Sequence, residues 1–161
     1  MITLTTKVWA DGLTGREVTD FLLRAGDEDY RRWWPGTHLQ FHTLQHVEGD
    51  IGNLIYFEEF VGKRHERTQA LVVDLVPGRR LVWQLKKGIR WPIWIELELQ
   101  DGAGGVAITQ TTRVGYEGAG RILDPLLRLY FSRGYARALD DHATTEFPRL
   151  RELLHGPGSS R

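Results

Sequence analysis

The sequence predicts an α+β domain in which an antiparallel β-sheet packs against one long C-terminal helix. The stretch from Thr37 to about residue 115 alternates with a period of two and is interrupted by short turn sequences. Such short links join only antiparallel neighbours, because a parallel crossover needs a dozen residues or more. The last thirty or so residues have the 3.6-residue period of an amphipathic helix. Together these patterns predict a layered helix-on-sheet arrangement.

The segment before the sheet contains one strand and two short helices. Residues 2–10 alternate and are expected to form the first strand. Residues 14–17, Thr-Gly-Arg-Glu, fit a capping box, which predicts a helix running to about Arg24. Asp27 is expected to cap a second short helix, which the Pro-Gly pair at 35–36 ends.

Six further strands bring the predicted sheet to seven. Turn sequences rich in glycine, proline and asparagine or aspartate separate them. The alternation is clearest at 93–99, where isoleucine and leucine alternate with tryptophan and glutamate, so one face of the sheet should be buried. The predicted strands cover about 37–47, 53–61, 66–76, 79–87, 91–100 and 105–115.

A single long helix is expected to close the fold. Asp124 and Pro125 are a suitable N-cap and first helical residue, although the helix could also begin a turn or two earlier, and it should run to about 154. Pro148 should kink it, because proline lacks the amide hydrogen and crowds the preceding turn. A curved sheet around one helix rarely closes completely, so we expect a cavity between them. Residues 1–155 then form one domain and 156–161 a flexible tail.

Composition excludes several classes of function. Lysine and arginine number 21, as do aspartate and glutamate, so no basic excess attracts nucleic acid or an anionic membrane. The chain has no cysteine, which rules out disulfides and thiolate metal sites. It has no apolar run near the ~20 residues of a membrane span and no signal-peptide pattern. We therefore expect a cytoplasmic protein with neither nucleic-acid nor membrane partners.

The most informative residues are His142 and Glu146 in the last helix. At ~100° per residue they fall on the apolar stripe that should face the interior. Residues four apart are neighbours on a helix face, and both types bind divalent metals. Burying polar groups without partners costs ~2–7 kcal/mol each. A metal, a polar ligand or a hydrogen-bonded structural pair would each explain the two residues.

The chain resembles the START-like, helix-grip superfamily (SRPBCC), which includes polyketide cyclase/dehydrase-like proteins and the birch-pollen-allergen fold. The resemblance covers roughly 2–154 and rests on the strand–turn–strand sequence Leu-Val-Pro-Gly-Arg-Arg-Leu-Val-Trp at 75–83 and on the terminal helix. It implies a seven-stranded curved antiparallel sheet, two short helices after the first strand, and a long C-terminal helix packed across the sheet over a cavity. Members typically bind small hydrophobic molecules there, and some are enzymes.

A narrower resemblance concerns the sequence Tyr-Arg-Arg-Trp-Trp-Pro-Gly-Thr-His at 30–38, which is similar to the diacetylphloroglucinol hydrolase-like group. In that group a strand histidine, a strand glutamate and a helical His-x-x-x-Glu bind zinc, and the hydrolase cleaves an acyl carbon–carbon bond. The resemblance implies zinc as cofactor, with four ligands in this sequence: His38, Glu59, His142 and Glu146. Glu58 is the alternative to Glu59, because the parity of the strand is ambiguous. A bulge near His38 would turn that residue inward.

Side chains for ligand binding are sought on the inner face of the sheet. Trp83 and Trp91 share the parity of the apolar residues in their strands and are the best candidates to line a pocket. Three other polar strand residues and one helical tyrosine could form hydrogen bonds with a ligand, although ordinary packing explains each equally simply: Tyr56, Gln110, Thr112 and Tyr135. The remaining histidines are assigned no role.

Two functions follow from these patterns. The first is a metal-dependent hydrolase or lyase that acts next to a carbonyl of a hydrophobic or aromatic, polyketide-like molecule. The second is a non-catalytic binding or carrier protein in which the same residues form hydrogen bonds only. A third reading is a partner-binding domain like the chaperone-activator branch of the superfamily. The sequence leaves the oligomeric state open, and a homodimer is compatible with it.

Overall fold

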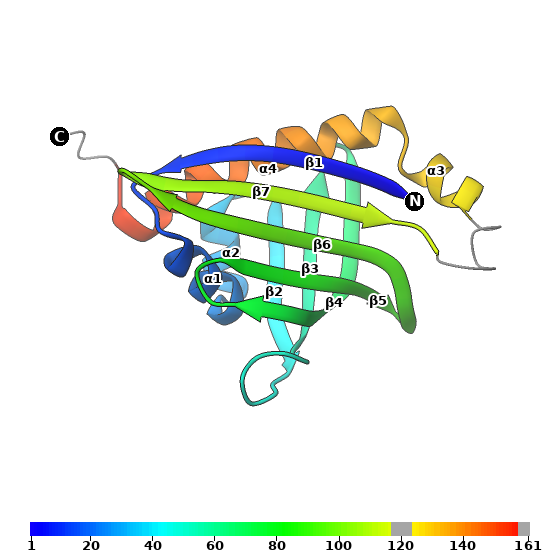
Figure 1. The fold of residues 1–161 in the computed structure, drawn as a ribbon, viewed down its shortest axis with the longest axis horizontal. Coiled ribbons are helices and arrows are strands. Elements are labelled where there is room, and N and C mark those ends of the chain that lie inside the picture. Colours follow the sequence, from blue (N-terminus) through cyan, green and yellow to red (C-terminus); the bar gives the residue numbers. More distant parts are fainter. Residues whose placement is uncertain (117–123, 158–161) are drawn as a thin grey trace.

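One curved antiparallel sheet of seven strands wraps around a long helix in the computed structural model, which describes residues 1–116 and 124–157 (Figure 1). The strand order β1-β7-β6-β5-β4-β3-β2 places the first and last strands side by side. All neighbours are antiparallel, and the predicted fold class is confirmed. The strands are β1 (Ile2–Asp11), β2 (His38–Gln45), β3 (Leu54–Val61), β4 (Arg64–Val76), β5 (Arg80–Lys87), β6 (Ile89–Gly102) and β7 (Gly105–Val114).

Two short helices, α1 (Gly15–Arg24) and α2 (Asp27–Trp33), connect β1 to β2. The predicted capping box of α1 is present, because Thr14 accepts from the amide of Glu17 while the Glu17 carboxylate accepts from the amide of Thr14. The expectation for Asp27 was wrong: it is the first residue of α2, and Gly26 is the cap. The Asp27 carboxylate instead accepts the amide of Phe41 at 2.8 Å, which fastens α2 to β2.

The C-terminal helix is divided, contrary to the prediction of one helix from 124 to 154. The chain forms α3 (Asp124–Tyr130), breaks, and continues as α4 (Arg133–His155). The Ser132 hydroxyl caps α4 by accepting from the amide of Tyr135 at 3.4 Å. Pro148 lies inside α4 as expected. An earlier start of the helix would fall on 117–123, and most of the expected tail on 158–161, both outside the described residues.

The helix α4 packs against β1, α2 and β3 and covers part of the concave face (Figure 1). Its fully buried Phe147 and Leu150 anchor the helix in the core beside α2 and the sheet. The part of the concave face near α3 is less filled and leaves the cavity described below. Among the described helices, none is long and apolar enough to cross a membrane.

Candidate metal centre and ligand cavity

Four side chains from three elements converge where α4 crosses the end of the sheet. His38 begins β2 and is paired with Glu59 of β3, while His142 and Glu146 lie one turn apart on α4. The register of β2 shifts between His38 and Gln40. This irregularity lets His38 share the buried inner face with Phe41, because strict alternation would place positions 38 and 41 on opposite faces.

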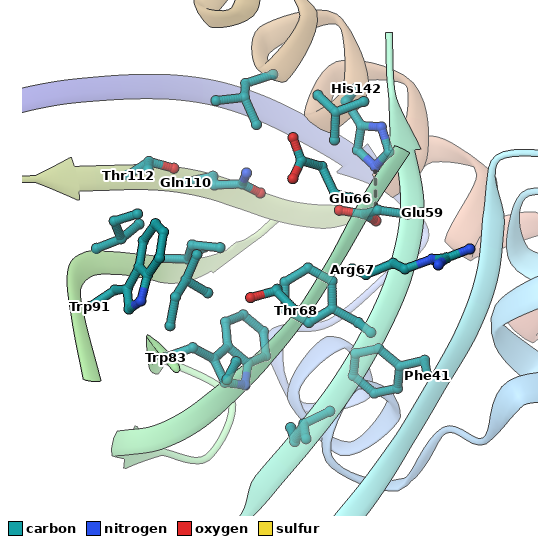
Figure 2. A pocket seen from close by; sticks show the side chains of 18 of the residues that line it. Phe41, Glu59, Glu66, Arg67, Thr68, Trp83, Trp91, Gln110, Thr112 and His142 are labelled. Carbon is teal, nitrogen blue, oxygen red and sulfur yellow. Dashed lines mark ion pairs between the residues drawn. The ribbon is translucent and has the colours of Figure 1, made fainter. Parts of the chain in front are cut away.

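Ligand atoms of His38, His142 and Glu146 all lie within 4.8 Å of one another, and the Glu59 carboxylate lies beside both imidazoles. His142 Nε2 lies 3.4 Å from Glu59 Oε2 and 3.5 Å from Glu146 Oε2. His38 Nε2 lies 3.5 Å from Glu146 Oε2 and 3.8 Å from Glu59 Oε2. Figure 2 shows His142 and Glu59 facing each other at one side of the cavity. The structure thus brings together all four residues that the sequence resemblance named, with Glu59 rather than Glu58.

The donor set suits a divalent cation. His38 is fully buried, and among the described residues its Nδ1 has no hydrogen-bond partner. Nε2 of His38 and Nε2 of His142 face carboxylates at 3.4–3.8 Å, and neither completes a hydrogen bond. Orphaned buried nitrogens are costly unless a ligand satisfies them. Two imidazoles and two carboxylates are the ligand types that zinc prefers when no thiolate is present. The residues present therefore fit a zinc ion.

Without a metal, the four groups are held by charge. Burial opposes the charged form of His142, but the Glu146 and Glu59 carboxylates outweigh it and raise the pKa of His142 to about 10. Burial likewise opposes ionised Glu146, but His142 and then His38 lower the pKa of Glu146 to about 2. An imidazolium among carboxylates therefore occupies the place that a cation would take.

Aromatic residues of α2 and its C-terminal end support this cluster from behind. The Tyr30 hydroxyl donates to Glu59 Oε2, and its ring stacks on the His38 ring at 4.0 Å with an interplanar angle of 4°. Burial, followed by the charge of Glu59, raises the pKa of Tyr30 well above its usual value, so it remains a donor. Trp33 Nε1 donates to the backbone carbonyl of Glu146 at 2.6 Å. Sequence reasoning had used Tyr30 only as part of a motif and had missed its contact with Glu59.

Glu59, His142 and Glu146 form one wall of a cavity of about 450 Å³ between the concave face of the sheet, α3 and α4. This is the size of pocket that holds a small organic molecule. Figure 2 shows Trp83 and Trp91 on the side opposite His142. Five of the six predicted ligand-binding residues line the cavity: Trp83, Trp91, Gln110, Thr112 and Tyr135. That they bind a ligand stays a prediction.

The sixth, Tyr56, lies outside the cavity lining, so its expected place there is corrected. Residues alternate between the two faces of a strand, and Ile55, Phe57 and Glu59 occupy the inner face of β3. The Tyr56 hydroxyl donates to Glu58 Oε2 at 3.0 Å on the other face.

Sequence reasoning also missed Glu66, the first residue of the strand predicted over 66–76. Glu66 is paired with Glu59 across β3 and β4 and lines the cavity. Its carboxylate accepts from the Tyr130 hydroxyl at 2.8 Å and from the Tyr135 hydroxyl at 3.1 Å. The parity that Glu66 shares with the buried Ala70 was the available signal.

The chain has a helix-grip fold with a cavity, and candidate metal ligands lie along one wall of this cavity. Solved structures with the same fold include a START superfamily protein from Mycobacterium smegmatis (12% identity, 88% of this chain and 94% of that one, TM-score 0.51). Another is the major latex-like protein 151 from Panax ginseng (11% identity, 88% of this chain and 98% of that one, TM-score 0.51). A third is the Aha1 dimer from Colwellia psychrerythraea (15% identity, 98% of this chain and 100% of that one, TM-score 0.53).

No protein-family model and no curated protein sequence matches the chain. The chain has the START-like, SRPBCC helix-grip fold, as its sequence predicts. At these identities the neighbours show the fold alone.

Proposed function

We propose that this protein is a zinc-dependent hydrolase or lyase that acts next to a carbonyl group of a hydrophobic small molecule. The observation that carries the proposal is the buried set of His38, Glu59, His142 and Glu146 beside an apolar cavity, with imidazole nitrogens that face carboxylates without completing a hydrogen bond. The same four positions are those that the sequence resemblance to the diacetylphloroglucinol hydrolase-like group assigns as zinc ligands.

The two sides of the cavity have different roles in this proposal, one holding the metal ion and the other positioning the substrate. His38, Glu59, His142 and Glu146 would hold the ion, and a bound zinc ion supplies a Lewis acid and lowers the pKa of water to about 7. Tyr30 orients the Glu59 carboxylate through its hydroxyl. Trp83 on the opposite side excludes water and positions the apolar body of the substrate.

The cavity also carries hydrogen-bonding groups for substrate orientation. Gln110 and Thr112 lie on the inner face of β7, and Figure 2 shows both side chains beside the cavity. Neither side chain forms a hydrogen bond within the described part of the chain. An amide and a hydroxyl at this position can bind a carbonyl or hydroxyl of the substrate and hold its reacting end toward Glu59.

A second candidate is a non-catalytic carrier with the same cavity. The observation that favours it is the ion pairing of the metal-free cluster, in which the His142 imidazolium already offsets part of the negative charge of Glu59 and Glu146. In that case the four residues act as a buried ion-pair network, which holds the helix on the sheet without chemistry.

Metal analysis of protein purified without an affinity tag separates the two candidates. We expect close to one zinc ion per chain, its loss in His142→Ala, and its retention in the control His65→Ala, whose imidazole pairs with Glu58 outside the cavity. Zinc should raise the melting temperature of chelator-treated wild type and not that of His142→Ala, because a ligand stabilises the state that binds it. If the purified protein holds no metal and its melting temperature changes with neither zinc nor chelator, only the non-catalytic carrier function remains.

A further inference from the structure

The rim of the cavity opposite the metal wall carries positive charge. Lys86 and Lys87, the last residues of β5, both line the cavity beside Trp91. Arg90 is paired with Lys86 across the β5–β6 hairpin and adds a third cation to the same end. Within the described part of the chain, none of these three residues forms an ion pair.

The other charged groups that line the cavity do not neutralise this rim. Arg67 pairs with Glu58 at 3.1 Å, outside the cavity. Glu66 is engaged by the hydroxyls of Tyr130 and Tyr135. The three cations therefore give the rim a local positive potential, although the formal charge of the whole chain is zero. Lysines that served only solubility would not need to cluster at the opening of a cavity.

The register of the sheet sets the distance between rim and metal wall. Glu59 pairs with Glu66, and Lys86 pairs with Gln69, three residues further along the same strand, β4. Two strand spacings of ~4.8 Å and three residues of ~3.3 Å place the Lys86 and Glu59 backbones on the order of 14 Å apart. Positions three apart on a strand face opposite sides of the sheet, so Lys86 shares the outer face with Gln69 and Tyr56, whereas Lys87 shares the inner face with Leu85. Lys87 is therefore the rim cation whose side chain is directed at the cavity, and the span from it to Glu59 matches a molecule of one or two rings with a substituent at each end.

We propose that the ligand is an amphipathic organic anion, an apolar body with a carboxylate or sulfonate that pairs with Lys87 at the rim, where the neighbouring Lys86 and Arg90 add to the positive charge. Its apolar body lies between Trp83 and Trp91, and the end remote from the anion faces Glu59 and His142. This inference rests on the proposed function only for the role of that remote end, because the anion is recognised by the rim whether or not a metal binds.

Two fluorescent probes that differ by a single charged group test the proposal. Anilinonaphthalene sulfonate carries a sulfonate, and N-phenylnaphthylamine is the same molecule without it. We expect Lys86→Gln/Lys87→Gln to weaken binding of the sulfonate by about fivefold and of the neutral probe by less than about twofold, as for pairs of partly exposed charges. The effect should disappear near ~0.5 M salt, where such charges are screened.

The matched control is Lys7→Gln/Lys63→Gln, which removes the same charge at positions outside the cavity lining and should leave both affinities unchanged. Equal losses for both probes would overturn the proposal, since the lysines would then only shape the hairpin. Unchanged affinity for the sulfonate would overturn it as well. Repeating the titrations in His142→Ala makes the test independent of the metal. If the rim binds the anion, the preference for the sulfonate over the neutral probe should be the same in that variant.

Discussion

Removal of the Tyr30 hydroxyl tests whether its hydrogen bond to Glu59 stabilises the candidate metal centre. Tyr30 is 4% exposed, and its hydroxyl donates to Glu59 Oε2 in a buried setting. A hydrogen bond to a charged group contributes about 1.5–3 kcal/mol. Tyr30→Phe keeps the ring that stacks on His38, so packing is preserved. We expect the free energy of unfolding of the metal-free protein to fall by about 2 kcal/mol.

Equilibrium unfolding in urea measures this loss, and Tyr56→Phe is the matched control. Tyr56 also donates to a glutamate, but Glu58 keeps His65 and Arg67 as partners on the other face of the sheet. That variant should lose less than about 0.5 kcal/mol. If zinc binds, Tyr30→Phe should also weaken its affinity by about ten- to hundredfold. Equal and small effects of both substitutions would refute the supporting role assigned to Tyr30.

Two further outcomes are expected. Trp83→Ala should weaken binding of N-phenylnaphthylamine by about fivefold or more, because it removes an aromatic side chain from the cavity wall. Trp9→Ala, which changes an exposed tryptophan outside the cavity lining, should leave this affinity unchanged. Unchanged affinity in Trp83→Ala would place Trp83 outside the binding site. Arg24→Gln should cost about 0.5 kcal/mol near pH 6, because the exposed guanidinium hydrogen-bonds to the Asp50 carboxylate and lowers its pKa. A lowered pKa stabilises the fold above the unfolded value, 3.8, and this contribution is lost as pH falls through the folded value. Urea unfolding of both proteins should therefore show the difference shrinking below about pH 4, and a difference independent of pH would contradict the assignment.

The strands and the inner face of the sheet could be predicted because alternation and turn chemistry agree along the chain. The choice between Glu58 and Glu59 needed the neighbouring strand, since parity within 54–61 alone leaves both open. Choosing Glu59 for the inner face already excludes Tyr56 from it, because the two positions have opposite parity. His38 required an irregularity that sequence can suggest and only coordinates can place.

The break between α3 and α4 could not be predicted from local preference. Tertiary contacts hold the end of α3: Tyr130 donates to Glu66, and its carbonyl accepts from Arg64 at 3.0 Å. Both partners lie on β4, far away in sequence. The position of Lys86 and Lys87 beside the cavity was missed for a similar reason, since a basic pair at a strand end has the pattern of ordinary solvated charge until the cavity is seen beside it.

The hydrogen bond from Trp33 to Glu146 joins positions 113 residues apart. The two halves of the candidate metal centre, His38 with Glu59 and His142 with Glu146, are also far apart along the chain. Contacts of such high sequence separation form late, because closing the intervening loop costs entropy before any contact repays it. In a chain emerging from the ribosome, His38 and Glu59 appear long before the last helix supplies the other two donors. Cation capture at full affinity would therefore mark the completion of folding.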